Sequence, residues 1–257
     1  MKDKILLAFE FAKRDLEEKY IGTGLGRFWF ILSPLIMIFI YSVIFADFMK
    51  MKINIVDNTY AYSIYLIPGL FAWTAFANTL LRLNTSFFEK ANLIKKISVP
   101  MYVFYLSIVI SEFVTFLISM LLGVIFLIII HQPITLSILW IIPIMILQSI
   151  FTLGLGVISS LFTPFFKDLK EIIPIILQLW FWMTPIVYVR TMIEKKYPFL
   201  LTYNPFYYFG RTYQDIFLYG KAPTFNNIFI MTIETLVVII LAGYLYKKMI
   251  STIKDII

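Results

Sequence analysis

Long uncharged stretches separated by short charged segments make up most of the chain. Residues 28–46 and 58–81 carry no charge, and another uncharged run extends over residues 113–166. An α-helix needs about 20 apolar residues to cross a hydrocarbon core of about 30 Å. The longest run is therefore sufficient for two helices, with a break at His131-Gln132-Pro133. The pattern predicts an all-α membrane protein whose six transmembrane helices are expected at residues 28–48, 60–82, 100–130, 137–164, 170–189 and 227–247.

The composition supports this prediction, because 61% of the 257 residues are hydrophobic and only 14% are charged. Six spans with short connections use nearly the whole chain, so we expect residues 1–257 to form a single transmembrane domain. An even number of spans places both termini on one side of the membrane. Lys and Arg are concentrated in the N-terminal segment, in the loop after the second span and in the C-terminal tail. This bias indicates that both termini are cytoplasmic.

The composition also excludes several kinds of site. The absence of cysteine excludes disulfides and thiolate metal sites, and a single histidine argues against a zinc or haem centre. No Gly-x-x-x-x-Gly-Lys-Ser/Thr loop occurs, so the chain lacks that means of binding ATP. The net charge of +7 is more typical of contact with anionic membrane lipids than of nucleic-acid binding.

Residues 1–22 have the pattern of an amphipathic helix, with charged side chains around one apolar face. That face consists of Ile5, Phe9, Ala12, Leu16 and Tyr20. The pattern predicts a helix that lies at the membrane interface rather than crossing the membrane. The alternative is a plain membrane anchor without a partner.

Residues 84–98 predict a short amphipathic helix on the cytoplasmic side. Asn84-Thr85-Ser86 offers residues that cap a helix start, and Pro100 ends the segment. Such a helix, joined directly to two spans, can transmit force from a docked protein. The alternative is a loop that basic residues anchor at the membrane surface.

Residues 190–226 form the longest segment on the outer side, and they are too apolar for a solvated loop. Pro198, Pro205 and Pro223 divide the segment into short pieces. Irregular backbone at membrane depth is tolerated where protein or a watery cavity shelters it. We therefore expect short helices that re-enter the outer leaflet.

Two acids, Glu112 and Glu234, fall inside predicted spans, with no basic or histidine residue inside a span beside them. We expect them to form hydrogen bonds between helices, or to pack in the protonated form, rather than to form a proton relay. Small residues of the fourth span, Gly154, Gly156, Ser159 and Ser160, predict one face of close helix packing.

Aromatic residues, 18% of the chain, recur at helical spacing in two spans. The candidates for lining a transport channel are Phe30, Tyr41 and Phe45 in the first span, and Trp180 and Tyr188 in the fifth. Aromatic rings offer an apolar body and a polar tip, which suits weak and repeated contacts with sugar rings. The alternative is packing against lipid or neighbouring helices.

Several short motifs occur along the chain in the order in which they occur in a known family. They are Arg14-Asp15-Leu16, Gly24-Leu25-Gly26-Arg27-Phe28-Trp29, Pro68-Gly69-Leu70-Phe71-Ala72-Trp73, Asn92-Leu93-Ile94-Lys95-Lys96, Thr184-Pro185-Ile186-Val187-Tyr188 and Asn204-Pro205-Phe206. With them the chain resembles permeases of the ABC-2 type, and among these the exporters of O-antigen, capsule or teichoic acid. Met101-Tyr102 stands where the family often has an Arg-Glu pair, so no role of that pair is carried over.

The resemblance implies a transport subunit and not an enzyme. Two copies form a homodimer with two separate ABC ATPase subunits, which bind ATP and Mg²⁺, so no cofactor and no metal is expected on this chain. The implied substrate is a polysaccharide linked to a polyprenyl diphosphate, exported across the bacterial inner (cytoplasmic) membrane.

The resemblance also implies roles for two groups of residues. Coupling to the ATPase, or gating, is expected of Phe87, Phe88, Leu93, Ile94, Lys95 and Lys96. The expected entrance for the substrate headgroup consists of Lys13, Arg14, Lys19 and Arg27. Less favoured alternatives for the whole chain are an exporter of a drug or small lipid and an intramembrane enzyme that acts on polyprenyl-linked sugars.

Overall fold

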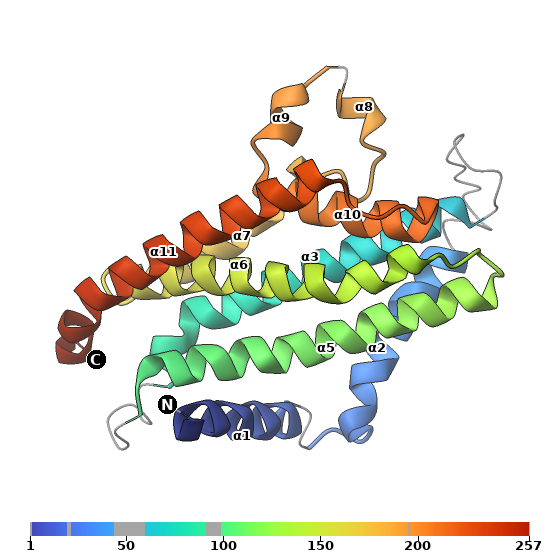
Figure 1. The fold of residues 1–257 in the computed structure, drawn as a ribbon. Coiled ribbons are helices and arrows are strands. Elements are labelled where there is room, and N and C mark those ends of the chain that lie inside the picture. The colour runs from blue at the N-terminus through green and yellow to red at the C-terminus, as the bar shows by residue number, and fades with distance from the viewer. Residues whose placement is uncertain (1, 20–21, 44–59, 91–98, 195, 257) are drawn as a thin grey trace.

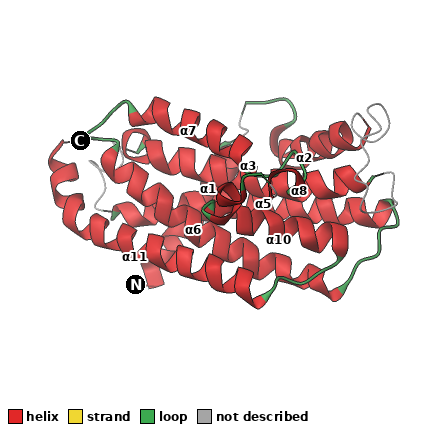
Figure 2. Cartoon of the chain, turned by 90° about the horizontal axis from the view of Figure 1, so that it is seen from above, coloured by secondary structure: helices red, strands yellow, loops and turns green. Residues whose placement is uncertain are grey.

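The computed structural model describes residues 2–19, 22–43, 60–90, 99–194 and 196–256, and every regular element in these ranges is a helix (Figures 1 and 2). The elements are α1 (Lys2–Glu18), η1 (Gly26–Phe28), α2 (Trp29–Phe39), α3 (Ala61–Glu89), α5 (Met101–Ile129), η3 (Leu136–Trp140), α6 (Ile141–Phe162), α7 (Leu169–Met183), α8 (Thr191–Glu194), α9 (Pro198–Thr202), α10 (Pro205–Tyr219) and α11 (Phe225–Ile256).

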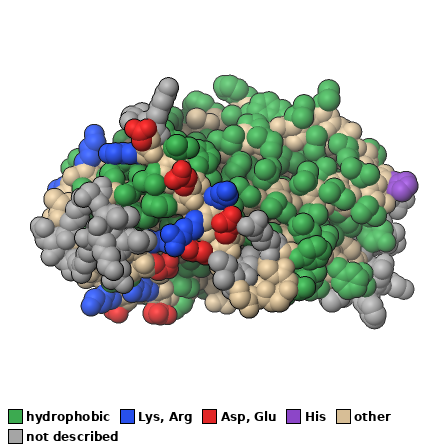
Figure 3. Space-filling view, turned by 90° about the horizontal axis from the view of Figure 1, so that it is seen from below, with side chains coloured by type: hydrophobic (Ala, Val, Ile, Leu, Met, Phe, Trp, Pro, Cys, Tyr) green, Lys and Arg blue, Asp and Glu red, His purple; other side chains and the backbone are tan. Residues whose placement is uncertain are grey.

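Four helical stretches within the described ranges are long and apolar enough to cross a membrane. They are Ala61–Glu89, Met101–Ile129, Leu136–Phe162 and Phe225–Ile253. The described part of the expected first span is a shorter apolar helix, Trp29–Val43. Figure 3 shows one face of the molecule on which charged side chains gather toward the end that holds the termini, while the rest is largely hydrophobic. This distribution is typical of a protein embedded in lipid.

The expected fifth span, 170–189, ends earlier than predicted. α7 stops at Met183, and Thr184 is extended (φ −102°, ψ 131°). The cause is Pro185, because a proline disfavours helical geometry in the residue before it and has no backbone N–H to donate. Residues 184–190 are non-helical. We call them the outer segment, since they follow the span at its expected outer end.

The predicted division between the second span and a separate helix over residues 84–98 is wrong for the described residues. α3 continues without interruption to Glu89, so Asn84, Thr85 and Ser86 lie inside the helix rather than at a start. No proline or glycine lies between Arg82 and Glu89 to end the helix, and cap-forming residue types alone do not stop one. Residues 91–98 lie outside the described ranges.

α6 packs between α3 and α11, and two glycines permit the close approach. A Cβ on Gly156 would lie 2.2 Å from Leu83 Cδ1 of α3, and one on Gly154 would lie 2.7 Å from Val238 Cγ1 of α11. The prediction of close packing is confirmed, but the prediction of a single face is wrong. Residues two apart on a helix point to nearly opposite sides, so each glycine serves a different neighbour.

α1 lies alongside α5 and runs in the same direction (Figure 1). Ala8 and Ala12 are fully buried, and the ring of Phe11 stacks on that of Phe104. Ile5 and Phe9 are about half exposed. The predicted apolar face is therefore divided, because small alanines allow α1 close to α5 and the larger apolar side chains point outward.

Candidate functional site

Five side chains from α1, α3 and α5 form a cluster of ion pairs and hydrogen bonds. Arg82 donates from Nη2 to Asp15 Oδ1 (2.5 Å) and from Nη1 to Glu112 Oε1 (2.6 Å). Lys19 Nζ donates to the same Glu112 oxygen (3.1 Å), and Ser111 Oγ donates to Asp15 Oδ2 (2.6 Å). We call Asp15, Lys19, Arg82, Ser111 and Glu112 the charge cluster. It joins the N-terminal helix to two of the long helices.

The charge cluster is sheltered and balanced in charge. The Glu112 side chain is only 3% exposed, while those of Arg82 and Lys19 are 26% and 29% exposed. A buried carboxylate is costly unless it is paired. The ion pairs with Arg82 and Lys19 therefore explain how a charged Glu112 is tolerated at this buried position. Burial alone raises the pKa of the Asp15 carboxyl, but the hydrogen bonds from Arg82 and Ser111 outweigh it and hold that pKa below its ordinary value.

The expected hydrogen bond between helices is confirmed for Glu112, which accepts from Arg82 of α3, but the expectation that no basic residue lies beside it is wrong. Lys19 follows α1 and Arg82 belongs to α3, 93 and 30 residues away in the sequence. Sequence patterns therefore gave no sign of either contact. Asp15 was missed as a site residue, although it belongs to the quoted Arg14-Asp15-Leu16 motif. For Glu234 the expected hydrogen bond between helices is absent at Oε2, which has no partner among the described residues.

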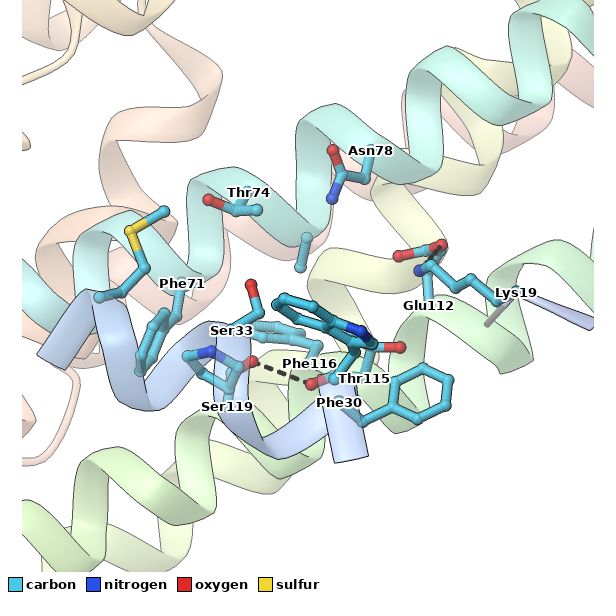
Figure 4. Close-up of a pocket in the computed structure, with 14 residues that line it drawn as sticks. Lys19, Phe30, Ser33, Phe71, Thr74, Asn78, Glu112, Thr115, Phe116 and Ser119 are labelled. Atoms are coloured by element: carbon cyan, nitrogen blue, oxygen red, sulfur yellow. Dashed lines mark hydrogen bonds and ion pairs between the residues drawn. The ribbon is translucent and has the colours of Figure 1, made fainter. Parts of the chain in front are cut away.

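A pocket of about 170 Å³ adjoins the charge cluster between α2, α3 and α5 (Figure 4). Its polar lining residues are Lys19, Ser33, Thr74, Asn78, Glu112, Thr115 and Ser119. Its apolar lining residues are Trp29, Phe30, Pro34, Met37, Phe71, Ala75 and Phe116. Lys19 and Glu112 lie at one end and Phe71 toward the other (Figure 4). Half of the lining residues are polar, which is a larger share than in the usual ligand site with its mostly apolar wall and few convergent polar groups.

The aromatic residues expected on one face of the first span have different surroundings. Phe30 is 9% exposed and lines the pocket. Tyr41 packs against the hydrophobic core, and its carbonyl accepts a hydrogen bond from Ser63 Oγ (2.8 Å). Phe45 lies outside the described residues. A channel role for these positions stays a prediction.

Tyrosine hydroxyls of α3 donate hydrogen bonds to backbone carbonyls of the outer segment. Tyr62 donates to the Val187 carbonyl (2.6 Å), and Tyr65 donates to the Pro185 carbonyl (2.9 Å). Gln214 of α10 also donates to the Pro185 carbonyl (3.1 Å). Carbonyls that leave a helix inside an apolar environment need such partners, so these side chains permit the break after α7.

Asn204 joins α7 to α10 through hydrogen bonds of its side chain. Its Oδ1 accepts from the Phe206 backbone N–H at the start of α10 (3.1 Å) and from Trp180 Nε1 (2.7 Å). Its Nδ2 donates to Thr184 Oγ1 (2.8 Å). The Trp180 indole N–H is thus engaged within the chain, and Tyr188 donates its hydroxyl to the Trp182 carbonyl.

Replacing Asn204 with leucine should destabilise the outer side of the protein. Loss of the helix cap costs about 1 kcal/mol, and the Trp180 indole N–H left unpaired costs about 1–3 kcal/mol. The Thr184 hydroxyl keeps its hydrogen bond to the Trp180 carbonyl. Thermal unfolding of the detergent-solubilised protein measures the change. Asn226→Leu is the matched control, because Asn226 is exposed on the first turn of α11. Equal melting temperatures for the two variants would contradict the assignment.

A second ion-pair group holds the end of the outer segment. Arg190 Nη1 donates to Asp215 Oδ1 (2.8 Å), and Arg211 Nε donates to Asp215 Oδ2 (3.4 Å). Asp215 was not among the expected site residues. The i, i+4 spacing of Arg211 and Asp215 was visible in the sequence, but the contact with Arg190 requires the fold.

Of the residues expected to couple or gate, two are described. Phe87 is buried and its ring meets that of Tyr105 edge-on, while Lys170 Nζ lies 3.4 Å from the centre of the Phe88 ring. Both occupy the last turns of α3. The remaining four, Leu93, Ile94, Lys95 and Lys96, lie outside the described residues.

Three of the four basic residues expected at a headgroup entrance have described side chains, and their surroundings differ. Lys13 and Arg14 are exposed on α1, and Arg14 pairs with Glu18 (2.6 Å). Lys19 belongs to the charge cluster. The side chain of Arg27 lies outside the described residues. Among the described residues no group of three or more His, Cys, Asp and Glu side chains could hold a metal ion.

Comparisons with known proteins identify similar chains over most of the length. A family profile described as "ABC-2 type transporter" matches residues 8–218. Two proteins of Klebsiella pneumoniae, each named "O-antigen export system permease protein RfbA", are 35% identical over 208 residues (80% of this chain and 78% of the relative) and 32% identical over 237 residues (92% and 89%). A Myxococcus xanthus protein of the same name is 24% identical over 244 residues (94% and 92%).

Proposed function

Because the chain belongs to the ABC-2 type transporter family, we propose that it is the transmembrane permease of an ABC transporter that exports O-antigen. The observation that carries this proposal is the similarity to the two Klebsiella permeases over most of both chains. The all-helical bundle with four long apolar helices agrees with a transport subunit. The sequence motifs also resemble those of ABC-2 type permeases that export polysaccharides.

The permease works with a separate ABC ATPase subunit, two copies of each forming the transporter. This assignment is supported by the family and by the lack of a phosphate-binding loop in the sequence. ATP and Mg²⁺ bind to the partner, and the permease performs no chemistry on the glycan. The substrate is a polysaccharide on a polyprenyl diphosphate lipid.

The permease lies in the inner membrane with six spans, in which α2 and α7 complete the four long helices. Both termini lie at the same end of the bundle (Figure 1), which supports placing them together in the cytoplasm. α1 then lies at the cytoplasmic interface, while α8, α9 and α10 form the outer re-entrant part.

The charge cluster connects the ATPase-binding helix α1 mechanically to the membrane helices α3 and α5. α1 and the residues after α3 contact the ATPase, including Leu93, Ile94, Lys95 and Lys96, and Phe87 and Phe88 anchor that end of α3. A displacement of α1 reaches α3 and α5 through Arg82, because one guanidinium holds Asp15 and Glu112 together. Lys13, Arg14 and Arg27 receive the diphosphate headgroup, whereas Lys19 is paired with Glu112.

The purified chain alone should hydrolyse no ATP, and it should co-purify with an ABC ATPase subunit in equal number. Deleting the permease should leave O-antigen inside the cell, and the wild-type gene should restore it to the surface. Vanadate-sensitive hydrolysis by the permease without a partner would be incompatible with the proposal. Unchanged O-antigen display after deletion, with loss of capsule or teichoic acid instead, would reassign the glycan.

A further inference from the structure

The pocket beside the charge cluster has a polar lining that helix packing does not account for. Thr74 and Asn78 stand one turn apart in the middle of α3, and both are exposed. The Asn78 side chain has no hydrogen-bond partner among the residues that the structure describes, and it points into the pocket (Figure 4). An unpaired amide facing lipid is costly, so this face of α3 meets water or a polar ligand.

The opposite wall adds hydroxyl groups at the same level. Ser119 Oγ donates to the Thr115 carbonyl (3.0 Å), and Thr115 Oγ1 donates to the Ser111 carbonyl (3.2 Å). Their protons are engaged, so both oxygens remain acceptors toward the pocket. Ser33 of α2 adds a further hydroxyl. The Asn78 amide supplies hydrogen-bond donors. The pocket therefore offers both donors and acceptors to a ligand hydroxyl.

Aromatic side chains supply the apolar part of the site. Phe30, Phe71 and Phe116 line the pocket together with Trp29. Rings beside an amide and hydroxyls fit a ligand that has C–H faces and hydroxyl edges, which is the chemistry of a sugar ring. The volume of about 170 Å³ greatly exceeds the roughly 10–15 Å³ that one water molecule needs.

The charges at the end of the pocket favour a neutral ligand over a phosphate. Lys19 and Glu112 pair with each other, and Arg82 is shared between Glu112 and Asp15. An incoming phosphate would have to displace a buried carboxylate from its bases, whereas a sugar hydroxyl leaves these pairs intact.

We propose that the pocket between α2, α3 and α5 binds a neutral sugar unit of the exported glycan, with Asn78 and Thr74 as the groups that recognise its hydroxyls. This inference rests on the proposed function. It goes further in placing a sugar-binding site within one protomer, on α3 and α5, where the sequence pattern indicated only aromatic residues of the first and fifth spans.

The test uses the absence of cysteine from the chain. Asn78→Cys is made in the complex with its ATPase and exposed to a water-soluble thiol reagent. The reagent should label Cys-substituted protein, and O-antigen chains released from their lipid should abolish the labelling. Inorganic diphosphate should have no effect. Ser251→Cys near the C-terminal end of α11, exposed and outside the pocket, is the control whose labelling the glycan should leave unchanged.

Three outcomes of the labelling experiment would overturn the inference. They are labelling by membrane-soluble reagents alone, labelling that free glycan does not slow, and protection by diphosphate alone. In the first case lipid or a second copy of the chain covers Asn78, and in the last the pocket takes a headgroup.

Export measurements separate this inference from the proposed function. Asn78→Leu and Thr74→Val should each slow export about five- to tenfold, since each removes one hydrogen bond to the sugar, whereas Ser149→Ala should export at the wild-type rate. If the wild-type complex exports glycan and Asn78→Leu exports equally fast, the sugar site is wrong and the transporter assignment stands. If the wild-type complex exports no glycan, the proposed function itself fails.

Discussion

Replacing Arg82 with alanine should abolish export and release α1 from α5. The change leaves Asp15 without its base and Glu112 with Lys19 as its remaining basic partner. Removing one member of a buried ion pair costs about 3–5 kcal/mol, and the partial exposure of Arg82 places the expected cost at the lower end. The release is measured with cysteines at Phe11 and Phe104, whose rings stack at 5.4 Å. A short thiol crosslinker should join them in the wild-type background and fail in the Arg82→Ala protein.

Arg14→Ala is the matched control, because it removes an arginine whose ion pair with Glu18 is solvent-exposed. Exposed pairs contribute little to stability, so crosslinking should persist. A second variant separates charge from packing. Combining Arg82→Leu with Asp15→Asn removes the carboxylate that would lose its base, leaves Glu112 paired with Lys19, and should recover crosslinking. Wild-type crosslinking and export in Arg82→Ala would show that the charge cluster does not hold α1.

Gly156→Ala should sharply reduce the amount of folded protein in the membrane. The added Cβ would lie 2.7 Å from Leu83 Cβ, which cannot move without a shift of α3. Overpacking of this kind costs about 1–3 kcal/mol, and more where backbone has to move. Thermal unfolding in detergent, together with the quantity of protein extracted, measures the effect.

Gly243→Ala on α11 is the control for the Gly156 variant. No heavy atom lies within 4 Å of a Cβ at Gly243, so this change should be neutral or stabilise by about 0.5–1 kcal/mol through the better helix propensity of alanine. Adding Leu83→Ala to Gly156→Ala should return part of the lost stability by making room. Equal melting temperatures for Gly156→Ala and Gly243→Ala would refute close packing of α6 on α3.

The sequence predicts the helical class of this protein well because the signal is local. Long uncharged runs specify long apolar helices, and the four longest agree with expectation. Helix ends were less predictable. Pro185 stops α7 before the hydrophobic run itself ends, whereas the cap-forming residues 84–86 stop nothing, since no helix breaker accompanies them.

The candidate site was harder to predict than the fold. Asp15 and Arg82 are 67 residues apart in the sequence, and only the packing of both α1 and α3 on α5 brings them together. Part of the pocket was visible, because Thr74, Asn78 and Arg82 recur every four residues and form one polar stripe on α3. Which helix faces that stripe depends on tertiary packing, so the pocket could not be derived from the pattern.

α3 takes part in polar contacts near both of its ends, through Arg82 at the charge cluster and through Tyr62 and Tyr65 at the outer segment. About twenty residues separate Tyr62 from Arg82, which corresponds to about 30 Å of α-helix. This length equals the thickness of a typical hydrocarbon core. Because these contacts join α3 to other helices of the same chain at both levels, α3 cannot slide past its neighbours along the membrane normal. A thinner bilayer is then accommodated by tilting of the helices together.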